Sequence, residues 1–582
     1  MIKTVVRITA VLLVSSLGLH ALAQATDEPG YNIVLGRPTD RGVAISILAE
    51  SGASAFVEYG EASADSTSYA AQSEIVSSNS GDPILIELDG AQPNTRYYYR
   101  VNYSAPDTDS FVSGFEHSFM TQRDENETFH FGVQGDSHPE RNNNQMFHPD
   151  LYLLTMEQVA QRQPDLYFML GDDFSIERQI ADFKTDNFES GHLFSKAEEG
   201  SWPYAKYQQE IEYPFIESEI GEGTSDDPRM AGSGTQLEQR REYLAHMTHS
   251  TALFHVNGNH EQTQLVNTGG IFNNAAVWAA DARNRYYPLP KPNDFYTGNN
   301  VPIVGQNGYP GLAGDGLPRD YYAFTWGDAL FVTLDPYWHS PVSPNTPIHN
   351  AEPRNQGWKI SMGDEQYQWL QETLEGSNAK YKFVFAHHVN GTGRGAAAII
   401  GRQEWGGHSN QGSWEFAENR PTWSKPIHQL MNDAGVTIFF GAHDHVFSRE
   451  KVDNVVYQSV PNPADNSYWA YNCEAYDPDT IPSFSDPSGE YGSYDPNYGV
   501  IKPNAGFLDV VVSPDHVQVN YVRSYRDIDL ENNANALFSG DEVNGEVAFS
   551  YSIPAQAGDD LAADHAYSCM GKSPPNDHVY FQ

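Results

Sequence analysis

The chain has 582 residues, of which 13% are aromatic, and its formal net charge is −43 at pH 7. This length allows two or three domains with sizeable cores, and the aromatic content argues against a disordered chain. Acidic side chains are spread along the sequence, so the surface repels nucleic acid and anionic membranes and keeps the protein soluble.

The first residues have the pattern of an export signal. Lys3 and Arg7 precede an apolar run from Ile8 to Leu19, and a small-residue cleavage site ends at Ala23. We therefore expect a signal peptide at 1–23 and a secreted or periplasmic protein. A membrane anchor is the alternative, but the run is shorter than the ~20 residues of a spanning helix, and no later stretch is predicted to cross a bilayer.

Residues 24–123 are predicted to form an all-β sandwich domain. Short alternating runs bounded by polar turns predict strands at Val43 to Ile47, Ala55 to Tyr59, Ile84 to Leu88 and Arg96 to Val101. The segment from Leu88 to Val101 resembles the tyrosine-corner segment of a fibronectin type III domain, and His117 to Thr121 resembles the last strand of that domain. The predicted role of this domain is to brace its neighbour.

From Thr128 onward the pattern changes to strand, loop and helix, which predicts an α/β domain over 124–526. The predicted helices are Pro149 to Gln163, Gln236 to Thr248 and Asp364 to Glu375. The predicted strands are Phe129 to Val133, Leu166 to Leu170, Ala252 to Val256, Ala329 to Leu334, Lys382 to Ala386, Val436 to Phe440, Val455 to Val460, Phe507 to Ser513 and Val517 to Val522. Long insertions at about 174–234, 262–319 and 389–425 are assigned to the wall of a substrate pocket.

Residues 527–582 are predicted to form an irregular, acidic tail. The chain has two cysteines, Cys473 and Cys569, and an exported protein more often joins such a pair than leaves it reduced. A disulfide between them would tie back the tail and stabilise the fold by roughly 2–4 kcal/mol.

Five apolar runs that are predicted to be strands end directly in clusters of Asp, Asn or His. The clusters are Gly135–His138 (GDSH), Gly171–Asp173 (GDD), Gly258–Glu261 (GNHE), His387–His388 (HH) and Gly441–His445 (GAHDH). Loops at the carboxyl ends of strands are where open α/β sheets assemble their active sites. Oxygen and imidazole ligands suit divalent zinc, manganese, iron or cobalt, so the clusters predict a two-metal hydrolase site.

The ordered clusters resemble those of calcineurin-type metallophosphoesterases, in the purple-acid-phosphatase-like branch with an N-terminal fibronectin-like domain. The likeness covers most of residues 31–525, including Tyr321 to Phe324 and Glu365 to Leu370. It implies an α/β fold of two packed mixed β-sheets flanked by helices, preceded by the sandwich domain.

The resemblance also implies two divalent cations that share one aspartate. By motif position, the first would be held by Asp136, His138, Asp172 and His445, and the second by Asp172, Asn259, His387 and His443. A bridging carboxylate lets two cations lie ~3.5–4 Å apart, close enough to hold one hydroxide between them. Two carboxylates leave about two positive charges at the cluster, which attracts phosphate in an acidic protein.

Further residues are assigned from their neighbours in the motifs. His260 follows Asn259, so its side chain should point away from the metals yet stay near the bound phosphate, to stabilise the transition state and protonate the leaving oxygen. The alternative is that His260 only orients Asn259. His388 and Arg394 are candidates for substrate binding, although a lone Arg in a Gly-rich loop is more often solvated. Ser175 stands where the purple enzymes carry a tyrosine, which disfavours a ferric centre and predicts a neutral to alkaline pH optimum.

Together these assignments predict an exported phosphoesterase that hydrolyses small phosphate monoesters by attack of a metal-bound hydroxide. A phosphodiesterase acting on small diesters or nucleotides with the same ligands is the close alternative, because specificity depends on the pocket walls. A non-catalytic surface protein with a structural metal site is the remote alternative. It would need broken or closed ligand sets, whereas every ligand position in this sequence is filled.

Overall fold

The computed structural model describes residues 30–555 apart from 50–51, 64–68, 80–81, 107, 109, 140–146, 174–235, 262–274, 305–311, 341–356, 388, 390–399, 410–411, 446, 466–498, 503–504 and 530–543. The predictions for the signal peptide, for Ser175, His388 and Arg394, and for a disulfide between Cys473 and Cys569 lie outside the described residues. Among the helices that are described, none is long and apolar enough to span a bilayer.

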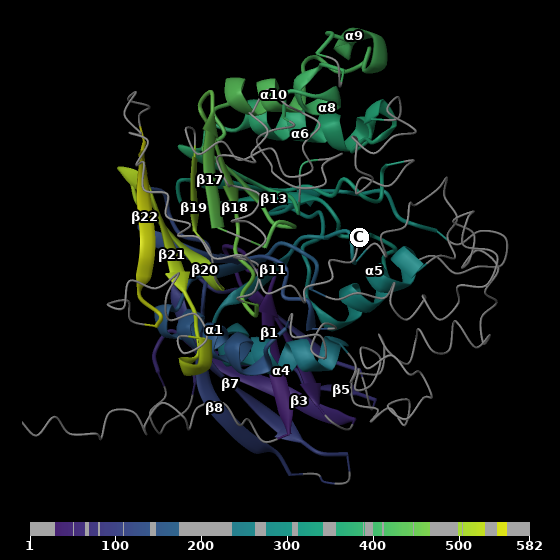
Figure 1. The fold of residues 1–582 in the computed structure, drawn as a ribbon. Helices are drawn as coiled ribbons and strands as arrows, with labels where there is room; N and C mark the ends of the chain where they lie inside the picture. The colour runs from purple at the N-terminus through teal and green to yellow at the C-terminus, as the bar shows by residue number, and fades with distance from the viewer. Residues whose placement is uncertain are drawn as a thin grey trace, which may run out of the picture.

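Two large mixed sheets form the centre of the structure (Figure 1). The first sheet has nine strands in the order β22 (Val547–Pro554), β21 (His516–Arg523), β20 (Gly506–Val512), β9 (Phe129–Gln134), β10 (Leu166–Met169), β11 (Ala252–His255), β1 (Tyr31–Gly36), β2 (Val43–Ala49) and β6 (Ile84–Leu88). The second has eight, in the order β12 (Thr297–Gly298), β13 (Tyr322–Trp326), β14 (Ala329–Thr333), β15 (Tyr381–Phe385), β16 (Ile438–Gly441), β18 (Val455–Ser459), β17 (Phe447–Val452) and β19 (Gly499–Lys502). The parallel strands are β9, β10, β11 and β1 in the first sheet and β14, β15, β16 and β18 in the second.

The two large sheets pack face to face through phenylalanine rings. Phe168 on β10 stacks on Phe385 of β15 with ring centroids 4.2 Å apart, and on Phe331 of β14 at 5.5 Å. Successive strand residues face opposite sides of a sheet. Phe168 therefore enters this inter-sheet core, while its neighbours Tyr167 and Met169 pack on the other side with the helices. Burial on both faces explains why β10 is apolar along its whole length.

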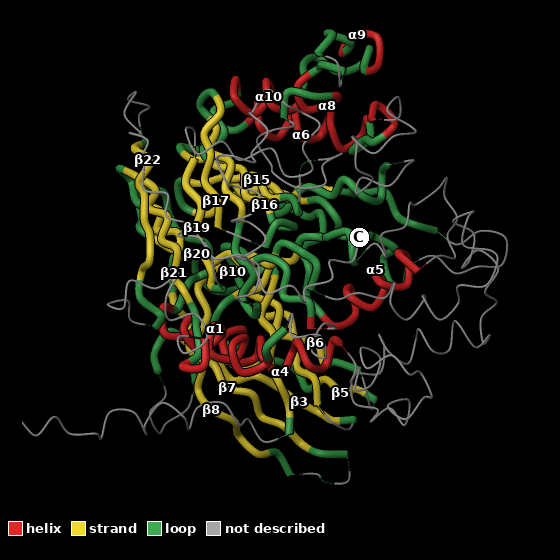
Figure 2. The backbone as a smooth tube through the Cα atoms, viewed as in Figure 1, coloured by secondary structure: helices red, strands yellow, loops and turns green. Residues whose placement is uncertain are grey.

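Helices cover the outer faces of the two large sheets (Figure 2). On the first sheet lie α1 (Pro149–Arg162), α4 (Gln236–Thr248) and the end of α5 (Ala275–Tyr286). On the second lie α6 (Asp364–Gly376), α8 (Gln403–Gly406), α9 (Phe416–Asn419), α10 (Ile427–Asp433) and the short 3₁₀ turn η4 (Gly357–Lys359). The predicted helices agree with α1, α4 and α6 to within one residue at each end. Four-residue helices such as α8 and α9 are too short to show a helical period in the sequence.

The N-terminal strands are present, and three of them belong to the first large sheet. The third sheet contains β4 (Ala71–Gln72), β3 (Ala53–Gly60), β7 (Arg96–Ser104) and β8 (Val112–Met120), with β5 (Val76–Ser78) paired to β3. The strands facing it, β1, β2 and β6, continue the first large sheet through a parallel pair in which Leu35 lies opposite Ala252. The tyrosine-corner bond is formed, since the amide of Gln92 donates to the hydroxyl of Tyr97 at 2.9 Å. An independent sandwich is therefore not confirmed.

The prediction of an irregular tail after 526 is wrong for 547–554. These residues form β22, the edge strand that pairs with β21 and extends the first sheet. The segment alternates apolar and small or polar residues through Val547, Phe549, Tyr551 and Ile553, which is the pattern of a half-buried strand.

Candidate metal centre

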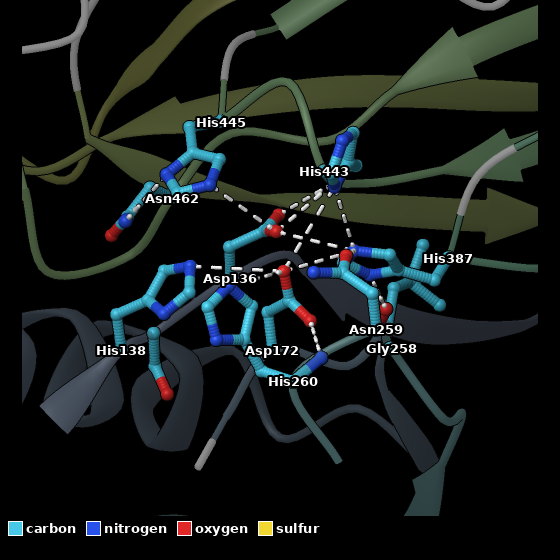
Figure 3. Close-up of polar contacts among 12 residues, drawn as sticks. Asp136, His138, Asp172, Gly258, Asn259, His260, His387, His443, His445 and Asn462 are labelled. Carbon is cyan, nitrogen blue, oxygen red and sulfur yellow. Dashed lines mark hydrogen bonds and ion pairs between the residues drawn. The ribbon is translucent and has the colours of Figure 1, made fainter. Parts of the chain in front are cut away.

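The five polar clusters meet where strands of the two large sheets end. Each cluster follows a strand, namely β9, β10, β11, β15 or β16. Strands β9, β10 and β11 are parallel to one another in the first sheet, as are β15 and β16 in the second. The facing sheets bring the carboxyl ends of all five strands together, as Figure 3 shows for the side chains. The residues that meet there, each at most 8% exposed, are Asp136, His138, Asp172, Asn259, His260, His387, His443 and His445.

One oxygen of Asp172 lies at the centre of the group. Its Oδ2 atom is 3.1 Å from His387 Nε2, 3.8 Å from both His138 Nε2 and His260 Nε2, and 4.0 Å from His443 Nδ1. The other oxygen, Oδ1, accepts a hydrogen bond of 2.9 Å from the backbone N–H of His260. The geometry therefore leaves Oδ2 to face imidazoles of both predicted metal subsites.

Asp136 forms the second carboxylate of the group. Its Oδ1 atom is 3.4 Å from His445 Nε2 and 3.7 Å from His387 Nε2, and the backbone N–H of His443 donates to both of its oxygens at 3.0 and 2.9 Å. A carboxylate held by backbone N–H groups keeps a fixed orientation towards a bound cation.

The ligand atoms divide into compact groups that match the predicted subsites. The ligand atoms of Asp136, His138 and His445 lie within 4.8 Å of one another, and so do those of Asp172, His387 and His443. A third such group joins His138, Asp172 and His260. The structure thus brings together all seven residues predicted as ligands, and their assignment to particular ions stays a prediction.

Two contacts orient donor atoms towards the centre. His387 Nδ1 is 2.7 Å from the carbonyl of Leu170, which can only accept, so Nδ1 carries a hydrogen and Nε2 faces the carboxylates. Asn259 Oδ1 lies 3.1 Å from the same Nε2 atom. The amide nitrogen of Asn259 is buried and has no hydrogen-bond partner among the described residues. Asn259 is therefore held with its oxygen, the atom that binds cations, turned inward.

Four of the predicted ligands have a left-handed backbone, which is uncommon outside glycine. The φ angles are 48° at His138, 53° at Asp172, 69° at His443 and 61° at His445. Such strain persists only where the surroundings fix it, and it concentrates at functional sites. The amide of His138, for example, donates to the carbonyl of Asp172 at 3.1 Å.

The electrostatics of the cluster favour bound positive charge. Burial raises the pKa of Asp136 to about 8, assisted by Asp172 and opposed by His387. Burial alone would lower the pKa of His387, but Asp172 and Asp136 raise it to about 10. At Asp172, His387 and His260 outweigh burial and hold the pKa of the carboxyl well below its usual range. Asp172 therefore stays ionised, whereas Asp136 and His387 bind protons that a divalent cation would replace.

Sequence reasoning misplaced one residue and overlooked two. The side chain of His260 was expected to point away from the metals, yet its Nε2 lies 3.8 Å from Asp172 Oδ2, and its ring meets that of His138 edge to face at 4.8 Å. Asn462, from the loop after β18, places its amide nitrogen 3.4 Å from His445 Nδ1. Glu261, the last residue of the GNHE cluster, contacts backbone N–H groups of two loops. The residue type of Glu261 was visible in the motif, whereas its contacts were not.

The resemblance to metallophosphoesterases predicted two packed sheets flanked by helices, with Asp, Asn and His clusters at the strand ends. The structure has this arrangement. The chain aligns with the structure of PhoD at 12% sequence identity and a TM-score of 0.52, over 84% of this chain and 85% of that chain. It aligns with purple acid phosphatase PPD1 from yellow lupin (Lupinus luteus) seeds at 12% identity and a TM-score of 0.48, over 90% of this chain and 75% of that chain. No protein-family model and no curated protein matches the sequence. The likeness to PhoD shows that the two chains share a fold.

Proposed function

We propose that this protein is an exported phosphoesterase that uses two divalent cations to hydrolyse small phosphate monoesters. The observation that carries the proposal is the convergence of the Asp136 and Asp172 carboxylates, four imidazoles and an amide oxygen at the strand ends of a metallophosphoesterase-type fold. When bound there, the cations would activate a water molecule and neutralise charge on the phosphoryl oxygens.

The residues of the chain supply orientation and proton transfer in this proposal. Asp172 would be shared by both cations through Oδ2, because its Oδ1 is already bonded to the amide of His260. When side-chain atoms alone are counted, His260 and His443 are each 10% exposed, whereas His138 and His387 are fully buried. His260 therefore has a route to a substrate, and we assign it the proton that goes to the leaving oxygen.

Other parts of the proposal rest on the sequence. The pattern at 1–23 supports export to a secreted or periplasmic location, and a sandwich over 24–123 would brace the catalytic domain. Zinc, manganese, iron and cobalt all suit the ligand set of carboxylate, imidazole and amide oxygen. Since a pair of divalent ions acidifies water less than a ferric ion does, we expect a neutral to alkaline pH optimum.

The proposal is tested by stripping the mature protein with a chelator and restoring manganese, zinc, iron or cobalt separately. We expect two equivalents of metal to bind and to restore hydrolysis of p-nitrophenyl phosphate, with a slower rate on bis(p-nitrophenyl) phosphate. A faster rate on the bis ester would replace the monoesterase assignment by the phosphodiesterase one. Equal rates in the stripped and the loaded protein would refute metal dependence.

A further inference from the structure

Glu261 uses its buried carboxylate to join two of the loops that carry predicted metal ligands. The side chain is 0% exposed. Its Oε2 atom accepts hydrogen bonds from the backbone N–H groups of Asp172 at 2.8 Å and Gly258 at 2.7 Å, and its Oε1 atom accepts one from Asp173 at 2.7 Å. One carboxylate therefore holds the loop after β10 against the loop after β11.

The two loops are also in direct contact with each other. A Cβ atom added at Gly171 would lie 2.3 Å from the backbone nitrogen of Gly258, and Gly171 has a φ of +89°. The amide of His260 donates to Asp172 Oδ1 from across the same contact. Because backbone meets backbone here, a small shift of either loop changes the distance between the bridging Asp172 and the neighbouring ligand Asn259.

Asp173 extends the connection to a third loop. Its Oδ1 atom accepts a hydrogen bond of 2.7 Å from Ser137, which lies between the predicted ligands Asp136 and His138. Its Oδ2 atom lies 3.6 Å from His255 Nε2, and the ligand atoms of Asp173, His255 and Glu261 all lie within 4.8 Å of one another. Both oxygens of Glu261 already accept hydrogen bonds from backbone N–H groups. These contacts therefore favour a structural link between the loops over a third cation site.

The two predicted metal subsites depend on this link to different degrees. Both subsites share Asp172, whose amide bonds to Glu261. The other predicted ligands of the first subsite, Asp136, His138 and His445, come from loops that do not contain Glu261 or Gly258. The second takes Asn259 from the Glu261 loop itself, and Asn is a neutral ligand whose oxygen must be positioned well to bind strongly. Loss of the link should therefore weaken the second subsite before the first.

We propose that Glu261 is a positioning residue that builds the second metal subsite by fixing Asn259 relative to Asp172. The proposal rests on the two-metal site of the proposed function. Glu261 does not touch substrate or metal in this arrangement, and it acts through the backbone of Asp172 and Gly258. Residues that orient ligands in this way typically change metal affinity by 10–100-fold when they are replaced.

The test compares Glu261→Gln with a matched control, Glu404→Gln. Gln keeps the volume of Glu but turns an NH₂ group towards one of the backbone donors, so at least one of the three bonds is lost. Glu404 is 1% exposed, accepts the amide of Met362 at 3.0 Å and pairs with Arg420 at 3.1 Å, among the helices on the second sheet. The control therefore makes the same chemical change in a buried clamp outside the site.

The readout is metal binding to the full chain by equilibrium dialysis against buffered free zinc or manganese. We expect two equivalents for the parent and for Glu404→Gln. We expect Glu261→Gln to bind the first equivalent as the parent does and the second 10–100-fold more weakly. Equal second affinities in Glu261→Gln and the parent would overturn the proposal. A third equivalent lost on substitution would also overturn it, because Glu261 would then be a ligand. Fewer than two equivalents in the parent would instead refute the two-metal function.

A second measurement covers the case in which Glu261→Gln does not fold. In the metal-free parent, hydrogen exchange followed by mass spectrometry should show slow exchange in peptides that contain 171–173 and 258–261, because Glu261 bonds their amides without metal. Fast exchange there, beside slow exchange in the strands β10 and β11, would overturn the proposal.

Discussion

A single methyl group at Gly258 should disable the site, because it would collide with the predicted bridging ligand Asp172. A Cβ atom at this position would lie 2.3 Å from Asp172 Oδ1, 2.5 Å from the backbone nitrogen of Asp172 and 2.8 Å from Glu261 Oε2. Ordinary contact begins at 3.4 Å, so in a Gly258→Ala protein the loop that carries this position would have to move by about 1 Å, and a displacement of that size costs on the order of 10²-fold in rate.

The assay is hydrolysis of p-nitrophenyl phosphate by metal-loaded Gly258→Ala, together with its metal content. Gly376→Ala is the matched control, since a Cβ atom there would meet nothing within 4 Å. We expect about a hundredfold lower kcat and weaker metal binding in Gly258→Ala, and parent values in Gly376→Ala. A Gly258→Ala protein with parent activity and two bound metals would refute the close packing of the two loops as a requirement for the site.

Four further outcomes are expected. Asp172→Asn should fold, lose one or both metals and lose activity, and parent turnover in this variant would contradict the shared-ligand role. Because Asp172 and Asp136 raise the pKa of His387 to about 10, its imidazole is protonated at pH 7, so metal must displace that proton and apparent affinity should fall about tenfold for each unit of pH decrease. Chelator competition from pH 8 to pH 6 measures this, and a flat profile would contradict it. Arg241→Met removes donors to the carbonyls of Ser46 and Tyr286 and should lower the free energy of unfolding by about 2–4 kcal/mol in urea titrations. Phe168→Ala should cost about 3–5 kcal/mol in the same assay, because its ring fills the space between the sheets, and a loss under 1 kcal/mol would contradict that packing.

The site was more predictable from sequence than the pairing of the strands. Asp136, Asp172 and His387 each follow an apolar run directly, and parallel strands place such residues at one edge of a sheet, so local pattern was enough to bring them together. Strand β1 shows the limit. Its apolar residues predict a strand, but nothing in Tyr31–Gly36 specifies that β11, more than two hundred residues later, is its parallel neighbour. The pairing of β1 with β11 depends on how strands and helices distant in the sequence pack together.

The role of Glu261 shows a second limit, which concerns backbone groups. Sequence reasoning places side chains by type and spacing, and by that reasoning Glu261 was only the residue after His260. Its three partners are main-chain N–H groups of Asp172, Asp173 and Gly258, which every non-proline residue carries, so they leave no trace in composition or spacing.

The conformation of the ligand loops links these two limits. Left-handed backbone at residues such as Asp172 and His443 costs of order 1–3 kcal/mol each, so the isolated sequence disfavours the loops that the site needs. The strands fix where each loop begins, and contacts between loops then supply what local preference does not. The amide of His443 bonds to Asp136, and the amides of Asp172 and Gly258 bond to Glu261. The geometry of the candidate metal centre is therefore a property of the assembled sheet edges, and carboxylates that bond to backbone N–H groups are as much a part of it as the carboxylates predicted to bind cations.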